Sequence, residues 1–347
     1  MNLRRIDNPP NPFDTEHRDW LGPAPEARIE VYEETSGSIL SRNDSPDLPF
    51  TWSVNPYRGC QHGCAYCYAR TYHEYLGYGA GTDFETRLVV KLNAAELLRK
   101  AFSRKSWRGE FVNFSGITDC YQPLEAAYAI TRQCLQVCLD FANPAMIVTK
   151  GFLVVRDADL LRALDERAGA SVYVSVPFAD RQAAALIEPQ APPPARRFEA
   201  IRRLRDAGVP VGVFVAPVIP GLTDRDIPSI LEQAADAGAQ WAAMTALRLP
   251  GSVEYVFTTR LRQVMPLKAD RILSRLRDIR GGKLDESAFG ARFRGEGVYW
   301  RSIRDLFDVA RRQHGLAHSS EVTAVPRTPP QNAPPRDDPQ LALEFPA

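Results

Sequence analysis

Three cysteines lie within eight residues of this chain, in the stretch NPYRGCQHGCAYCYAR at positions 55–70. Their spacing, C-x3-C-x2-C, is set by Cys60, Cys64 and Cys67. Structural zinc sites and ferredoxin-type clusters generally need four protein ligands, and the other three cysteines supply no matching pair. Three thiolates can instead bind three irons of a cubane and leave the fourth iron open to a non-protein ligand. Because an open metal position is a mark of catalysis, the triplet predicts a catalytic iron–sulfur cluster.

A zinc site is the alternative interpretation of this triplet. Three thiolates and either His62 or His73 would complete a tetrahedral zinc site, although His62 is more simply an ordinary loop residue. Gly59 and Gly63 favour the cluster, because glycine lets the backbone wrap closely around a bulky group. Six cysteines without a paired spacing do not indicate a disulfide framework, so metal binding in a reducing cytoplasm is expected.

The composition is that of an ordinary globular chain of 347 residues, 44% hydrophobic and 24% charged. This length suits one large domain or two medium ones. A net charge of +1 gives no whole-chain argument for nucleic acid. The sequence has no apolar run of about 18 residues and no apolar N-terminal segment, so neither a membrane span nor a secretory signal is expected.

The middle of the chain alternates short apolar runs with helical patterns. Strands are expected at 51–54, 111–116, 146–150, 171–176, 209–218 and 241–247, with helices at 123–141, 157–167, 180–187, 195–207 and 226–237. Strands separated by helices predict parallel βαβ units, and six of them suit a full or partial α/β barrel. An open doubly wound sheet gives the same pattern. In either fold the carboxyl ends of the strands carry the chemistry.

The pattern C-x3-C-x-aromatic-C, with Tyr66 before Cys67, resembles the radical S-adenosylmethionine (SAM) superfamily. In that superfamily the open iron chelates SAM, and reduction of the cluster releases a 5′-deoxyadenosyl radical that abstracts hydrogen from a substrate. The resemblance implies a 4Fe-4S cluster on Cys60, Cys64 and Cys67, SAM as cofactor, and an external one-electron reductant. It also implies an α/β fold, a partial (β/α)6 TIM-type barrel.

Further segments resemble the spore photoproduct lyase-like branch, often labelled DNA-repair photolyase. They run in order from NPYRGC through SGITDCYQPLE, IVTKGFLVVRD and SVYVSVPF to FVAPVIPGLTD, over about residues 53–226. This resemblance implies a lyase-like radical reaction on a nucleic-acid lesion or base. The alternatives are a radical SAM enzyme acting on a small metabolite or protein, and a non-catalytic iron–sulfur protein. A light-driven photolyase is disfavoured, because no G-x-G-x-x-G fingerprint follows a strand.

The resemblance also implies roles for residues at strand ends. Tyr66 and Ala216 would lie near the adenine of SAM, and Thr118, beside Asp119, near its amino-acid moiety. Lys150 would pair with the SAM carboxylate, a role that suits a flexible cation. Ser175 would hydrogen-bond the ribose or the carboxylate.

Two further residues carry open alternatives. Arg197 would contact SAM or substrate, or would form a plain ion pair with Glu188 or Glu199. Spore photoproduct lyase carries a hydrogen-donor cysteine at the position that corresponds here to Gly116. Cys120 could replace it if the turn returns its thiol to the barrel mouth; otherwise Cys120 is a small buried hydrophobe.

Four segments follow from these patterns: an irregular N-terminal segment at 1–50 with a short strand at 29–32, a radical SAM barrel core at 51–258, a basic helical C-terminal extension at 259–317, and a disordered proline-rich tail at 318–347.

The C-terminal extension has a distinctive charge. Fourteen Lys or Arg against seven Asp or Glu give +7 between Arg260 and Arg312, with aromatic residues interleaved. Such a surface suits DNA, although two solvated helices at 260–280 and 299–313 would have the same composition. Near the end of the tail, Gln340–Phe345 (QLALEF) resembles the hexapeptide by which bacterial proteins dock on the DNA sliding clamp.

Overall fold

The computed structural model describes residues 28–318. Its strands are β1 (Glu30–Glu34), β2 (Leu40–Arg42), β3 (Trp52–Val54), β4 (Tyr57–Arg58), β5 (Arg87–Lys91), β6 (Val112–Phe114), β7 (Ala145–Thr149), β8 (Ala170–Ser175), β9 (Val211–Val218), β10 (Trp241–Ala246) and β11 (Ala317–His318). Its helices are α1 (Arg70–Glu74), α2 (Asp83–Thr86), α3 (Ala94–Phe102), α4 (Glu125–Tyr128), α5 (Ile130–Asp140), α6 (Ala158–Arg167), α7 (Arg181–Ile187), α8 (Pro194–Asp206), α9 (Ile227–Asp236), α10 (Ser252–Val264), α11 (Pro266–Asp278) and α12 (Gly297–Gln313), with short 3-10 helices at Phe152–Asp157 and Asp224–Asp226.

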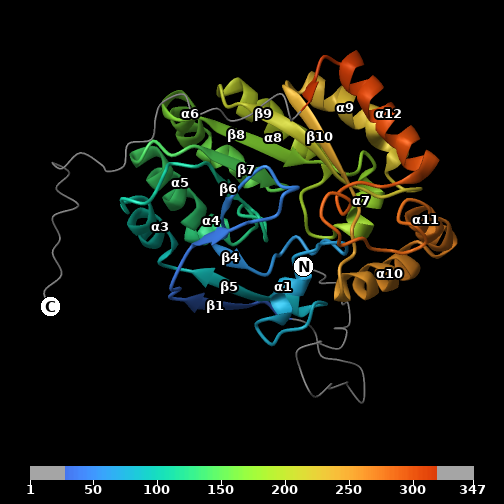
Figure 1. The fold of residues 1–347 in the computed structure, drawn as a ribbon, viewed down its shortest axis with the longest axis horizontal. Helices are drawn as coiled ribbons and strands as arrows, with labels where there is room; N and C mark the ends of the chain where they lie inside the picture. The colour runs from blue at the N-terminus through green and yellow to red at the C-terminus, as the bar shows by residue number, and fades with distance from the viewer. Residues whose placement is uncertain (1–27, 319–347) are drawn as a thin grey trace, which may run out of the picture.

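The main sheet has the strand order β11-β10-β9-β8-β7-β6-β3-β2. All neighbouring strands pair in parallel except β2, which is antiparallel to β3. Strands β3 and β6 to β10 are the six predicted strands. Among the described residues the sheet stays open between β2 and β11, so the predicted partial barrel is confirmed and no closed barrel forms. Figure 1 shows this curved sheet in the middle of the molecule, with α10 to α12 beyond its β10 end.

Local sequence accounts for these elements. Strand β8, with the sequence ASVYVS, is buried on both faces, as expected for a central parallel strand rich in β-branched residues. Helix α8 has a proline in its first turn, where the missing N–H has no intrahelical partner to lose. Because β6, β7, β8 and β9 run in the same direction, the residues that follow them gather at one rim of the sheet.

Two predicted helices are interrupted in the structure. The single helix expected at 123–141 is split into α4 and α5, because Ala129 adopts the left-handed conformation with φ of 52°. The helix expected at 260–280 is likewise two helices, with Pro266 at the start of α11. Proline lacks the N–H that would continue α10 across this point, so the chain bends there.

The N-terminal segment is more regular than the sequence predicts. Strand β1 pairs in parallel with β5 in a second sheet of order β1-β5-β4, and β2 extends the main sheet. Of the proline-rich tail predicted at 318–347, only His318 is described, in β11, so the hexapeptide Gln340–Phe345 lies outside the described residues. Among residues 28–318, no helix is long and apolar enough to cross a membrane.

Candidate active site

The three cysteines of the triplet lie on one loop at the rim, residues 59–69, which is called here the cluster loop. The Cys60 and Cys64 side chains are buried and that of Cys67 is partly buried. The loop is joined to its neighbours through its backbone, since Cys60 N donates to Phe84 O at 2.9 Å and Ala65 N donates to Ile187 O at 2.9 Å. The cysteines therefore sit in a backbone that two other segments hold in place.

Arg70 holds this loop from inside the protein. Its guanidinium is completely buried and donates to the carbonyl oxygens of Cys64 at 3.0 Å and Gly63 at 3.2 Å. It also donates to the carbonyls of Ala80 and Gly81, both at 2.8 Å, and forms an ion pair with Glu85. One side chain thus ties the cluster loop to the segment before α2 through a planar fork of donors, which only arginine offers.

Gly63 is required where the cluster loop passes this ion pair. Its φ is +64°, a conformation that glycine adopts without cost, and a Cβ there would lie 3.1 Å from the Glu85 carboxylate. The loop therefore packs against the Arg70–Glu85 pair more closely than any other residue would permit.

Asp119 and His62 form a buried pair beside the cysteines. His62 Nδ1 lies 3.3 Å from Asp119 Oδ2, and Asp119 also accepts from Thr149 Oγ1 at 2.6 Å and from the Lys150 backbone N at 2.7 Å. Burial opposes both charges, but Cys60 and Asp119 raise the pKa of His62 to about 10, and His62 lowers that of Asp119 to about 2. His62 is thus a loop residue whose ring is buried against Asp119.

A second polar group at the rim brings together four of the predicted residues. Lys150 Nζ donates to Ser175 Oγ at 2.8 Å and lies 3.8 Å from Glu188 Oε1. The Tyr66 hydroxyl donates to Glu188, and Arg197 forms an ion pair with the same carboxylate. Burial opposes ionisation of Glu188, but Arg197 and Lys150 outweigh it and lower the pKa. Glu188 is thus the common partner of this group.

Arg197 adopts one of its two predicted alternatives, the ion pair with Glu188. Its guanidinium also donates to Ser175 O at 3.0 Å and to Pro192 O at 2.7 Å, and it is almost completely buried. It therefore connects the end of β8 with the start of α8. Ala216 joins the group through its carbonyl, which accepts from Ser175 Oγ at 3.0 Å.

Thr118 and Cys120 lie apart from this group. The Thr118 hydroxyl donates to Tyr57 O at 2.9 Å, and the Cys120 side chain is fully buried in the hydrophobic core. Burial raises the pKa of the Cys120 thiol well above its ordinary value. The hydrogen-donor role of Cys120 stays a prediction, and the observed packing is that of a small hydrophobic residue.

The sequence pointed to Asp119 and Glu188 only beside other residues, as the neighbour of Thr118 and as a possible partner of Arg197, and did not assign them to the site themselves. Both had a signal in the sequence. Asp119 directly follows a predicted ligand at a strand end, and Glu188 follows a predicted helix at the same rim. Their role as partners of other side chains, however, depends on contacts across the barrel that no local pattern contains.

The cluster loop offers three thiols, and thiolates are the protein ligands of iron–sulfur clusters. In residues 28–318 no three His, Cys, Asp or Glu side chains are grouped as the ligands of one metal ion. Burial and neighbouring Cys60 raise the pKa of Cys67 to about 11, so metal binding must displace its proton.

His73 packs on Phe84, which itself packs against Cys60, and gives a test of the packing below the cluster loop. Its Nε2 lies 3.1 Å from Asp83 O, and its ring packs edge-on against Phe84 with centroids 5.7 Å apart. Burial lowers its pKa to about 4 from the ordinary value near 6.5.

Because the folded protein favours neutral His73, its contribution to stability should be complete above pH 6.5 and be lost as the pH falls toward 4. Across this pH interval, we expect the free energy of unfolding to fall by on the order of 2–3 kcal/mol more in the wild type than in a His73→Gln variant. Melting temperatures of both proteins measured between pH 7 and pH 4.5 check this. Equal losses would show that His73 does not titrate with folding.

The fold is a partial α/β barrel, and the loop with the three thiols lies at the rim formed by the carboxyl ends of its strands. Residues 54–234 match the family described as the Radical SAM superfamily. The chain belongs to this superfamily, and it is an enzyme of the radical SAM class. The superfamily uses a 4Fe-4S cluster and SAM. This membership argues against the alternative of a non-catalytic iron–sulfur protein.

The chain is also similar to individual proteins in sequence and in fold. An uncharacterized protein of Mycobacterium tuberculosis is 39% identical over 254 residues, which cover 72% of this chain and 74% of the relative. A radical SAM Nalpha-GlyT isomerase of Pseudomonas phage M6 is 27% identical over 188 residues, covering 53% of this chain and 37% of the relative. Spore photoproduct lyase, solved in complex with dinucleoside spore photoproduct, has the same fold at a TM-score of 0.59 and 16% identity, over 83% of this chain and 81% of that one.

Proposed function

We propose that this radical SAM enzyme acts on a lesion or base in nucleic acid, in a lyase-like reaction of DNA repair. The observation that carries the proposal is the placement of charge. The segment from Arg260 to Arg312 has a net charge of +7, whereas the whole chain has +1, so the remainder carries −6. A local positive surface on an otherwise acidic protein is the electrostatic footprint of a phosphate-backbone ligand.

The arginines of this segment are available for phosphates. Several are exposed and form no ion pair within residues 28–318, namely Arg262, Arg277, Arg294, Arg301 and Arg304. Because exposed cations without carboxylate partners gain most from phosphate contacts, this surface favours nucleic acid over a neutral metabolite. Spore photoproduct lyase, which shares the fold, has been solved with a dinucleoside ligand, and this supports the same substrate class.

The same proposal assigns roles at the rim. Cys60, Cys64 and Cys67 hold the 4Fe-4S cluster, which when bound and reduced supplies the electron that cleaves SAM. Lys150 binds the SAM carboxylate, with Glu188 and Ser175 fixing its ammonium group. Tyr66 is buried and hydrogen-bonded to Glu188, so its ring has one orientation against which the adenine can pack. Arg197 acts as the positioning partner of Glu188.

An anaerobic assay of 5′-deoxyadenosine tests the substrate class. Reconstituted, reduced protein is given SAM alone, SAM with undamaged DNA, or SAM with ultraviolet-irradiated DNA and base-modified oligonucleotides. We expect one of the lesion substrates to raise deoxyadenosine formation by at least about tenfold, since substrate binding completes many active sites. The increase should fall steeply between about 50 and 200 mM salt, because phosphate contacts release counterions.

The opposite result is equally definite. If no nucleic acid raises deoxyadenosine formation, while a metabolite or a peptide does, the substrate is not a nucleic acid. The alternative of a radical SAM enzyme acting on a small metabolite or protein would then replace this proposal.

The remaining parts of the proposal concern location and partners. An enzyme with an oxygen-sensitive cluster and unpaired cysteines belongs in a reducing cytoplasm, where an external one-electron reductant is present. A contact between the hexapeptide Gln340–Phe345 and the DNA sliding clamp would tether the enzyme to DNA.

A further inference from the structure

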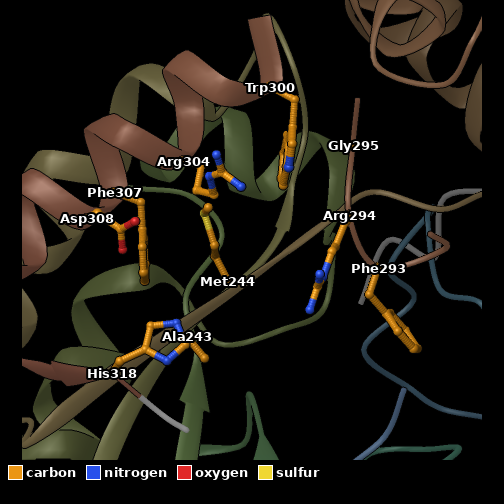
Figure 2. Close-up of a pocket in the computed structure, with 10 residues that line it drawn as sticks. All are labelled: Ala243, Met244, Phe293, Arg294, Gly295, Trp300, Arg304, Phe307, Asp308 and His318. Atoms are coloured by element: carbon orange, nitrogen blue, oxygen red, sulfur yellow. The ribbon is translucent and has the colours of Figure 1, made fainter. Parts of the chain in front are cut away.

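A cavity of about 410 Å³ lies beside β10, away from the cysteines. Within residues 28–318, strand β11 pairs with β10 at Trp241 and Ala242, and the next residues of β10, Ala243 and Met244, line the cavity. The opposite wall is one face of α12, and the loop at 293–295 forms the third side (Figure 2). The volume falls in the range of about 300–1,000 Å³ that is typical of small-molecule sites.

The loop that forms the third side is held rigidly. Arg280 is buried and donates to the carbonyls of Leu247 at 2.6 Å, Arg292 at 3.1 Å and Arg294 at 2.5 Å. Ala246 N donates to Phe293 O at 3.1 Å, so the loop continues the edge of β10. The cavity is therefore formed by the fold itself and does not depend on a ligand to shape it.

The wall on α12 combines an apolar surface with positive charge. Trp300 packs directly on the backbone of Gly295, where a Cβ would lie 2.7 Å from the indole ring, and with Met244 and Phe307 it lines the apolar side. Figure 2 shows the side chains of Arg304 and His318 facing that of Arg294 across the open space.

The charge of this lining is unbalanced. Arg294 and Arg304 form no ion pair within the part of the chain that the structure describes, and Asp308, the one carboxylate of the lining, lies 3.9 Å from Arg311. Two unpaired guanidinium groups across a cavity from each other favour an anion with oxygens on two sides, and phosphate is the anion that their fork geometry matches best.

We propose that this cavity binds one nucleoside phosphate, with its phosphate between Arg294 and Arg304 and its base or sugar against Met244 and Trp300. This inference deepens the proposed function and rests on it, because the nucleoside phosphate would be a unit of the substrate strand other than the reacting base. A free mononucleotide offers the same chemistry, and the experiment below distinguishes the two sources.

A chain of contacts connects this cavity with the cluster loop. The guanidinium carbon of Arg248 lies 5.4 Å from the ring centre of Phe293, at the cavity, and 5.8 Å from that of Tyr68, next to Cys67. The Tyr68 hydroxyl donates to Gly116 O at 2.5 Å. These contacts join the loop at 293–295, which forms one side of the cavity, to the cluster loop.

Calorimetric titration of the reconstituted, unreduced protein under anaerobic conditions tests the inference without any SAM cleavage. The probes are thymidine 5′-monophosphate, thymidine and a short single-stranded oligothymidylate, at one fixed salt concentration. Arg304→Glu is compared with Arg202→Glu, an exposed arginine of α8 that lies outside the basic segment 260–312 and does not line the cavity. We expect Arg304→Glu to weaken binding of the phosphate-bearing probes at least about tenfold, and Arg202→Glu by less than about twofold.

The outcomes separate the possibilities. Binding of both phosphate-bearing probes but not thymidine supports a free mononucleotide as ligand, and binding of the oligonucleotide alone supports a unit of a strand. Absence of binding, or equal weakening by Arg304→Glu and Arg202→Glu, overturns the inference. If a lesion raises deoxyadenosine formation and Arg304→Glu leaves this increase unchanged, the inference alone is overturned. If nucleotides bind in the cavity but no nucleic acid raises deoxyadenosine formation, the proposed function alone is overturned.

Discussion

Replacing Cys64 with alanine is expected to abolish 5′-deoxyadenosine formation and to remove most of the bound iron. The Cys64 thiol is buried next to Glu188 and cannot be replaced as a ligand by water without opening the loop. Loss of a residue that merely orients a ligand costs about 10- to 100-fold in metal affinity or activity, so loss of the ligand itself should cost more than about 100-fold. Iron content and deoxyadenosine yield after anaerobic reconstitution are the measurements.

Cys134→Ala is the matched control for this experiment. Cys134 is a fully buried cysteine on α5, in the hydrophobic core, and is not part of the cluster loop. Its replacement should cost about 1 kcal/mol of folding free energy and leave iron content unchanged. Retained iron and activity in Cys64→Ala, or equal loss of iron in Cys134→Ala, would contradict the assignment of the ligands.

The fold could be predicted from the sequence wherever the pattern was local. Alternating apolar runs and helical patterns placed all six parallel strands, because a buried parallel strand and an amphipathic helix each have a characteristic period. The left-handed residue Ala129, which splits one predicted helix, has no such signature, since alanine is normally a helix former. The short strands β2, β4 and β11 are stabilised by their partners in the sheets and carry too few residues to show a period.

The site divides in the same way. The family resemblance implied that Lys150 and Ser175 both contact SAM, and the two side chains are in contact at 2.8 Å. The ion pair of Arg197 with Glu188 joins residues nine positions apart, and the sequence offered it as one of two alternatives. What the sequence could not predict is that the same carboxylate also accepts from Tyr66, 122 residues away, and lies 3.8 Å from Lys150. Contacts between such distant segments follow from topology, which a single sequence does not specify.

Replacing Arg70 is the second change for which we expect a large effect, although we assign Arg70 no contact with SAM or substrate. Arg70→Met would leave Glu85 as a buried carboxylate without its partner and remove the donors to four backbone carbonyls. Breaking a buried ion pair in this way costs about 3–5 kcal/mol. Thermal unfolding of the cluster-free protein measures this loss, and an Arg70→Met/Glu85→Gln double variant should recover part of it, because the unpaired charge is then absent.

Arg70→Lys separates the structural role of this residue from its effect on the cluster. Lysine keeps the positive charge beside Glu85, but it cannot donate simultaneously to the carbonyls of Gly63 and Cys64 and to those of Ala80 and Gly81. We therefore expect Arg70→Lys to fold with a modest loss of melting temperature and yet to release iron to a chelator about 10- to 100-fold faster than the wild type. If iron release is unchanged while stability falls, Arg70 supports only the fold. If both are unchanged, a point charge is sufficient, and the fork of donors has no part in holding the loop that carries the three thiols.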